Sequence, residues 1–141
     1  MQQRDSSACQ RARVLIVDDE QLVLETLRRI LRKEHDLVIS TSATEAVASI
    51  LGGARYDVFL CDMMMPRLTG MDVHATLARY CPEQAERMAF VTGGATRSDL
   101  EIFLQRMSVP CLYKPFSVDS VLELVRTLMG RTLPPSSRSA T

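Results

Sequence analysis

The sequence lacks the features that mark secreted, membrane-spanning or nucleic-acid-binding proteins. Its 141 residues contain no tryptophan, and no apolar run approaches the ~20 residues that a membrane helix needs. The 17 basic and 17 acidic side chains cancel, and no block rich in lysine or arginine is present, which argues against nucleic-acid binding. The polar first ten residues lack the apolar centre of a signal peptide. These absences favour a cytoplasmic protein that binds neither membrane nor nucleic acid.

Cysteine is scarce as well. The four cysteines stand apart at positions 9, 61, 81 and 111, without a C-x-x-C pair. Two of them, Cys61 and Cys111, lie inside apolar runs, where a free cysteine usually acts as a small hydrophobic side chain. The spacing predicts a reduced, intracellular protein and offers no cluster typical of a thiolate metal site.

What is present is a regular alternation of strand-like and helical patterns, repeated five times with short connections. The predicted strands cover residues 14–17, 37–39, 56–61, 88–91 and 111–113, and the predicted helices cover about 20–33, 43–51, 73–80, 100–107 and 118–128. The length suits one domain, which we place at residues 13–130. A disordered N-terminal arm over residues 1–12 and a disordered tail over 131–141, rich in serine and proline, are expected on either side.

Alternation of this kind predicts an α/β fold, a parallel sheet with right-handed crossovers and helices on both faces. We expect the flavodoxin-like doubly wound (βα)5 arrangement, with five strands in the order 2-1-3-4-5. In that order the first and third strands flank the crevice where α/β proteins bind ligands.

Polar side chains stand where the predicted strands end. Asp18 and Asp19 follow the first strand, Asp62 the third, Thr92 the fourth and Lys114 the fifth. The expected strand order brings the three carboxylates together at the carboxyl edge of the sheet. Because neighbouring carboxylates repel one another, the cluster predicts a site that holds a cation.

These residues occur in the order found in a known family: the chain resembles a response regulator receiver domain, the phosphoacceptor module of two-component signalling. The resemblance covers roughly residues 13–129 and is carried by five matching motifs, which are Val17-Asp18-Asp19-Glu20, Cys61-Asp62-Met63-Met64-Met65-Pro66, the loop 66–72, Thr92 and Lys114-Pro115. Each motif alone is common, but all of them in order at strand ends form a specific signature.

The resemblance implies a magnesium-dependent phosphoacceptor site. Asp62 is similar to the aspartate that attacks a phosphoryl group and becomes an acyl phosphate. By the same resemblance, Asp19 binds Mg²⁺ directly, Asp18 binds it mainly through water, and the backbone carbonyl of Met64 is a further ligand. Mg²⁺ is a hard ion that prefers oxygen ligands of this kind.

The resemblance also implies a switch and partners. Thr92 would hydrogen-bond the phosphoryl group, and Lys114 would pair with Asp62 and then with a phosphoryl oxygen. The donor would be a histidine kinase or a histidine phosphotransfer protein. The output would be a changed surface over helix 100–107, strand 111–113 and helix 118–128, which binds a downstream protein. A homodimer is left open, as are a stand-alone receiver and one cut from a hybrid kinase.

One position departs from the family pattern. The family usually carries an aromatic residue three positions before the lysine, and this chain has Cys111 there. The nearby Tyr113 lies two residues along the strand, on the same face. Gly93 directly follows Thr92 and predicts an uncrowded loop beside the acceptor.

Three competing interpretations remain open from the sequence. A phosphatase similar to the haloacid dehalogenases also uses an aspartate nucleophile, but that family has a D-x-D motif and the acids here are adjacent. A receiver fold that is never phosphorylated would suit Cys111. Local structural roles are the third: Asp19 as a helix cap, the methionines at 63–65 as core filler, and His35 and His74 as structural or exposed residues.

Overall fold

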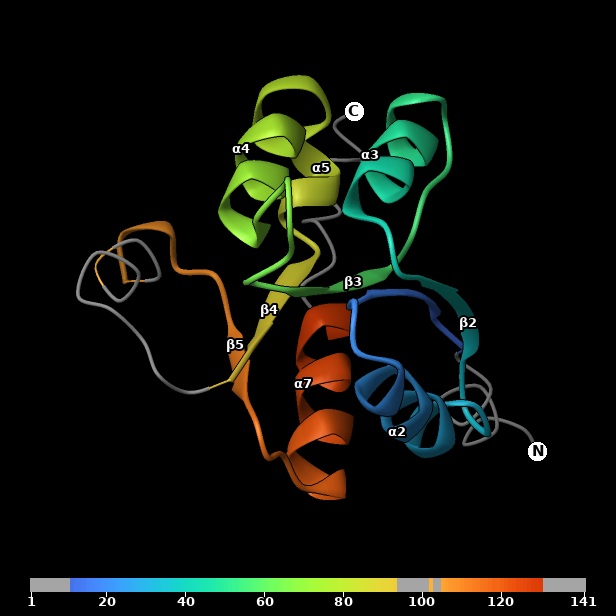
Figure 1. Ribbon diagram of the computed structural model, residues 1–141. Coiled ribbons are helices and arrows are strands. Elements are labelled where there is room, and N and C mark those ends of the chain that lie inside the picture. The colour runs from blue at the N-terminus through green and yellow to red at the C-terminus, as the bar shows by residue number, and fades with distance from the viewer. Residues whose placement is uncertain (1–10, 94–101, 103–104, 131–141) are drawn as a thin grey trace.

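The computed structural model describes residues 11–93, 102 and 105–130. The described chain forms a central sheet with helices on both sides (Figure 1). In chain order the elements are β1 (Arg13–Val17), α2 (Gln21–Leu31), β2 (Asp36–Ser40), α3 (Ala43–Leu51), β3 (Val58–Asp62), α4 (Gly70–Tyr80), α5 (Pro82–Ala85), β4 (Met88–Thr92), β5 (Cys111–Tyr113) and α7 (Val118–Gly130).

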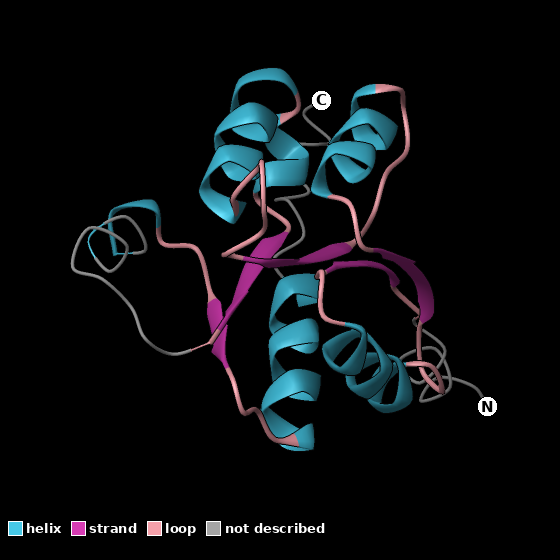
Figure 2. Cartoon of the chain, in the orientation of Figure 1, coloured by secondary structure: helices cyan, strands magenta, loops and turns pink. Residues whose placement is uncertain are grey.

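The sheet has five parallel strands in the order β2-β1-β3-β4-β5, which confirms the predicted topology (Figure 2). β1 and β3 are direct neighbours, with Val17 opposite Cys61. The carboxyl ends of these two strands therefore lie side by side.

The core has two halves because side chains alternate across each strand. Helices α3, α4 and α5 cover one face and α2 and α7 cover the other (Figure 1). In β3, Phe59 and Cys61 point to the first face, whereas Val58 and Leu60 point to the second. All five residues of β3 are buried, as expected for a central strand of a parallel sheet covered on both sides.

Local capping fixes where several helices begin. The Ser42 hydroxyl accepts a hydrogen bond from the Glu45 N–H at 3.1 Å, which is one half of a capping box. The Ser42 N–H instead donates to the Ser40 hydroxyl at 3.0 Å. At α4, Thr69 and Asp72 form a complete capping box that was not predicted.

The helix α5 was not predicted, although Pro82 at its first turn is a common helix start. Its residue Gln84 is buried and hydrogen-bonds both the N–H and the carbonyl of Tyr56 at 3.0 Å. A side-chain amide bound in this way attaches the short helix to the segment before β3.

Two residues that the prediction places in the N-terminal arm, Arg11 and Ala12, are held against the segment before β2. Ala12 is buried, its N–H donates to Nδ1 of His35 at 3.1 Å, and its carbonyl accepts from the Asp36 N–H. Arg11 forms an ion pair with Asp36 at 3.1 Å. Residues 1–10 and the predicted tail lie outside the described residues. Four residues define the predicted helix 100–107, and three of them, Leu100, Phe103 and Leu104, also lie outside the described residues. The fourth, Met107, is helical and 45% exposed.

Gly70 is the first residue of α4 and packs directly against Met63, in the loop that follows β3. A Cβ atom at this position would lie 3.0 Å from Met63 Cα and 3.0 Å from the Phe90 ring. The Gly70 N–H also donates to the Met63 carbonyl at 2.9 Å. The close approach therefore requires glycine.

We expect Gly70→Ala to lower the free energy of unfolding by about 1–3 kcal/mol, because the added methyl group overpacks against backbone that has little room to move. Urea unfolding followed by circular dichroism measures the change. The matched control is Gly130→Ala, where a Cβ meets nothing within 4 Å and the stability should change by less than about 0.5 kcal/mol. Equal effects of the two substitutions would contradict the packing argument.

Candidate functional site

The three predicted acids meet at the carboxyl edge of the sheet. Asp18 follows β1 directly and Asp62 is the last residue of β3. One carboxylate oxygen each from Asp18, Asp19 and Asp62 lies within 4.8 Å of the others. The strand order brings them together, since β1 and β3 are adjacent and parallel.

The three acids are held in unequal ways. Asp18 is 1% exposed. Its Oδ1 accepts a hydrogen bond from the Glu20 N–H at 2.9 Å, but its buried Oδ2 accepts no hydrogen bond from any described residue. Asp62 is 4% exposed, and its Oδ1 accepts from the Met64 N–H at 3.2 Å. Asp19 is exposed. It does not cap α2, because the residue at the N-cap is Glu20.

Lys114 brings the positive charge to this cluster. Its Nζ lies 2.9 Å from Glu20 Oε1, 3.4 Å from Asp18 Oδ2 and 4.0 Å from Asp62 Oδ1. The residue follows β5, and its backbone N–H donates to the Thr92 carbonyl at 2.8 Å. Sequence reasoning missed Glu20 as a partner of this lysine, although its position beside the acid pair was the available signal.

Burial and mutual repulsion change the pKa values of the acids. Burial, followed by the charge of Asp18, raises the pKa of Asp62 from 3.8 to about 6. Burial likewise raises the pKa of Asp18. For Lys114, burial lowers the pKa, but the Glu20 hydrogen bond and the charges of the two aspartates outweigh it, and the net shift is upward. The lysine therefore stays charged beside carboxylates that resist ionisation.

Asp19 and Asp62 open onto a cavity of about 600 Å³. Its lining comes from the ends of several strands and consists of Asp19, Glu20, Asp62, Met64, Gly93, Lys114 and Pro115. A Cβ on Gly93 would meet nothing within 4 Å, so this side of the cavity is uncrowded, as the sequence predicts. Met64 is exposed, while Met63 and Met65 on either side are buried core residues. Thr92, the last residue of β4, is also buried.

The donor set fits a hard divalent cation such as Mg²⁺. The oxygen ligands are carboxylates. Asp18 Oδ2 is buried, accepts no hydrogen bond within the described part of the chain and lies 3.4 Å from Lys114 Nζ. Four carboxylates face this one ammonium group at the sheet edge. Mg²⁺ prefers oxygen ligands and keeps part of its water shell, which suits a site open on one side.

The position of the family's aromatic residue is occupied by a small, partly buried side chain. Cys111 pairs in register with Phe90 of β4 and packs against the core beneath α3 and α4. Tyr113 is 49% exposed. A tyrosine therefore lies near the predicted switch position, two residues farther along β5 and on the surface.

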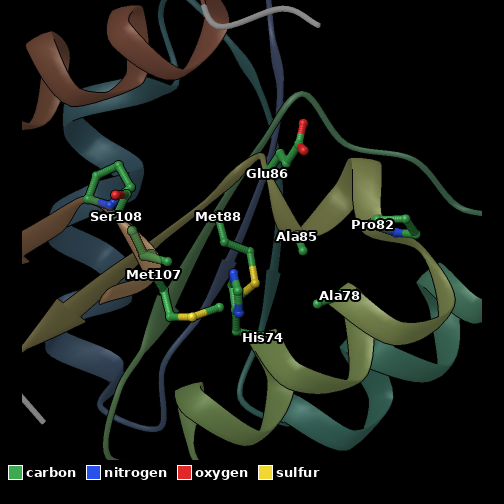
Figure 3. A pocket seen from close by; sticks show the side chains of 10 residues that line it. His74, Ala78, Pro82, Ala85, Glu86, Met88, Met107 and Ser108 are labelled. Carbon is green, nitrogen blue, oxygen red and sulfur yellow. The ribbon is translucent and has the colours of Figure 1, made fainter. Parts of the chain in front are cut away.

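A second cavity, of about 400 Å³, lies between α4, α5 and the segment before β5. His74, Met88 and Met107 project into it (Figure 3). His74 packs edge-on against Phe90 with ring centroids 6.2 Å apart, and burial lowers its pKa, so it is a neutral core residue. Glu86 is the only carboxylate among the lining residues.

Comparison with known proteins assigns the family. A sequence model of the response regulator receiver domain matches residues 14–126, most of the chain. The chain belongs to the response regulator receiver domain family. The receiver is 30% identical over 123 residues to the response regulator MprA of Mycobacterium sp. strain KMS. The alignment covers 86% of this chain and 52% of that protein, so the chain spans about half the length of the curated relatives it matches.

Solved receiver domains share the fold. The receiver domain of the Francisella response regulator 1452 is similar with a TM-score of 0.74 and 23% identity, covering 86% of this chain and 99% of that one. A receiver domain protein from Clostridium thermocellum has a TM-score of 0.73 and 25% identity, with 85% and 95% covered. Among the described residues of the receiver, the longest helix has 13 residues, too short to cross a bilayer.

The raised pKa of Asp62 makes the stability of the cation-free receiver depend on pH. The native state holds the Asp62 proton up to pH about 6, whereas the unfolded chain releases it near 3.8. The native state binds more protons in this window, so the stability contribution present at low pH is lost as the pH rises through it. The loss is on the order of 3 kcal/mol.

We therefore expect Asp62→Asn to be more stable than the wild type in EDTA at pH 7.5, with a difference that shrinks toward pH 4. Urea unfolding at several pH values measures the two stabilities. A difference that stays constant or grows on acidification would contradict the assigned cause. Saturating Mg²⁺ should reverse the order, because a cation that binds only the native state stabilises it.

Proposed function

We propose that this receiver accepts a phosphoryl group on Asp62 from a histidine kinase or a histidine phosphotransfer protein in the cytoplasm. Residues 13–130 form the signalling unit, which acts on no substrate other than its own phosphoryl group. The observation that carries the proposal is the meeting of Asp18, Asp19 and Asp62 within 4.8 Å, against Lys114 and beside an open cavity.

Asp62 is the nucleophile in this proposal. One of its carboxylate oxygens forms a bond to phosphorus while the bond from phosphorus to the donor's imidazole nitrogen breaks, and the nitrogen keeps the electron pair. With a pKa of about 6, the carboxylate is largely ionised at neutral pH. Positioning and charge stabilisation carry most of the catalysis of phosphoryl transfer.

The other site residues counter the charge on the phosphoryl group. Asp18, Asp19, Asp62 and the Met64 carbonyl would hold Mg²⁺, which would supply positive charge against the phosphoryl oxygens. Lys114 provides a second positive charge, 4.0 Å from Asp62 in the resting site. Thr92 ends β4, the strand next to β3. From this position its hydroxyl donates a hydrogen bond to the bound phosphoryl group.

The signal leaves through the surface formed by the described residues 105–107, β5 and α7. Tyr113 and Val118 are about half exposed on this part of the chain. The Thr92 carbonyl accepts a hydrogen bond from the N–H of Lys114, the first residue after β5. A rearrangement at Thr92 therefore reaches β5 directly, and a downstream protein or a second copy would read the change.

The proposal is tested by offering the receiver a small phosphodonor, acetyl phosphate, with and without Mg²⁺. We expect intact-mass spectrometry to show one phosphoryl adduct that requires Mg²⁺ and is lost after treatment with hydroxylamine, as an acyl phosphate is. Digestion after trapping should place the modification on the peptide containing Asp62. An adduct that forms equally in EDTA, or that lies on another residue, would overturn the proposal.

A further inference from the structure

Lys114 is bound most closely to a carboxylate that none of the proposed roles uses. Its Nζ donates to Glu20 Oε1 at 2.9 Å, whereas Asp62 Oδ1 lies 4.0 Å away. Glu20 is half exposed and lines the same cavity as Asp62. Its side chain makes no capping hydrogen bond to α2, although it stands at the N-cap. The carboxylate is therefore free to act on the lysine alone.

The ion pair opposes the movement that phosphoryl transfer requires. To neutralise a phosphoryl oxygen, the ammonium group must shift from Glu20 toward Asp62. Once a divalent cation binds the aspartates, their attraction for Lys114 is weakened, because their charge is shared with the cation. Glu20 lies outside that ligand set, so it becomes the strongest remaining attraction for the lysine.

We propose that Glu20 is a positioning residue that holds Lys114 away from the acceptor aspartate and so slows phosphorylation of this receiver. The inference rests on the proposed function of Asp62. The residue acts through the lysine and contacts neither the phosphoryl group nor the cation.

The expected effect is modest because the pair is partly exposed to water. An exposed ion pair contributes little, so its removal should speed phosphorylation about two- to fivefold. Loss of the Glu20 charge should also weaken Mg²⁺ binding about twofold, through the weaker field at the site. The rate and the Mg²⁺ affinity thus move in opposite directions, whereas loss of a metal ligand would lower both.

Two substitutions separate the contact from the charge. Glu20→Gln removes both. Glu20→Asp keeps the charge but shortens the side chain by about 1.5 Å, which breaks the contact with Lys114, and aspartate is well tolerated at an N-cap. The matched control is Glu25→Gln, which removes a carboxylate from the same helix, where Glu25 pairs with Arg28 rather than Lys114.

The experiment measures the rate of the acetyl phosphate reaction at saturating Mg²⁺, and the Mg²⁺ dissociation constant from amide chemical shifts. We expect Glu20→Gln and Glu20→Asp both to react about two- to fivefold faster, with weaker Mg²⁺ binding only in Glu20→Gln. Glu25→Gln should match the wild type. In a Lys114→Gln background, both Glu20 substitutions should lose their accelerating effect.

Several outcomes would overturn the inference while leaving the proposed function intact. These are an unchanged or slower rate in both Glu20 variants, a rate gain in Glu20→Gln that Glu20→Asp lacks, and a gain that survives in the Lys114→Gln background. A wild-type protein that forms no Mg²⁺-dependent adduct would instead overturn the proposed function, and the inference with it.

Discussion

Asp62→Asn is expected to reduce the phosphoryl adduct formed from acetyl phosphate and Mg²⁺ to background. The substitution keeps the size of the side chain but replaces the nucleophilic carboxylate by an amide, which is a far weaker nucleophile. No other described carboxylate combines burial at a strand end, a lysine ammonium group within 4.0 Å and an open cavity. Intact-mass spectrometry over a time course measures the loss.

The control for this prediction is Asp57→Asn, at the opposite end of the same strand. Asp57 is exposed and accepts a hydrogen bond from the Arg13 N–H at 2.8 Å, which an asparagine oxygen can also accept. We expect this variant to form the adduct at the wild-type rate. An adduct that persists at the wild-type level in Asp62→Asn would refute the assignment of the acceptor.

Lys114→Gln is expected to slow phosphorylation about 100-fold, in line with the loss of one preorganised charge-stabilising group in an enzyme site. Glutamine has a similar length but carries no charge, and the lysine is the only cation within 4.0 Å of Asp62 among the described residues. The rate of adduct formation at saturating Mg²⁺ is the measurement. The unfolding free energy should be followed in parallel, because Asp18 also loses its partner.

Lys33→Gln serves as the control for Lys114→Gln. Lys33 is an exposed residue just beyond the end of α2, and the same loss of charge at that position should leave the phosphorylation rate unchanged. Equal slowing in both variants would mean that net charge, rather than the local position of Lys114, governs the reaction with an anionic donor.

The order of the sheet was predictable because the sequence signals are strong and local. Short apolar runs rich in β-branched residues alternate with helical patterns, and parallel strands joined by right-handed crossovers leave few possible arrangements. The starts of α3 and α4 depend on residues within one turn of the chain, such as Ser42 and Thr69. Ser42 shows the limit, since its N–H bonds Ser40 instead of completing the capping box.

Contacts between distant residues were harder to predict. The pairing of Lys114 with Glu20 joins residues 94 positions apart. Glu20 stands beside the acid pair, but the local pattern does not show which of these acids the lysine approaches most closely. The buried amide of Gln84 is a similar case, because its partner Tyr56 lies 28 residues earlier. Such contacts depend on how the ends of β1, β3 and β5 are placed in space.

The amino-acid sequence by itself determined that this chain is an α/β protein with acids, a threonine and a lysine at the ends of its strands. The reason is that hydrophobic periodicity, and the polar residues that follow each apolar run, can be read directly from the local sequence. Only the tertiary structure decided how the three aspartates differ in exposure to solvent. Packing buries Asp18 and Asp62 and leaves Asp19 exposed, and the distances around Lys114 place its charge nearest to Glu20. Burial and distance set pKa values and ion-pair strengths, and both exist only once the strands are assembled.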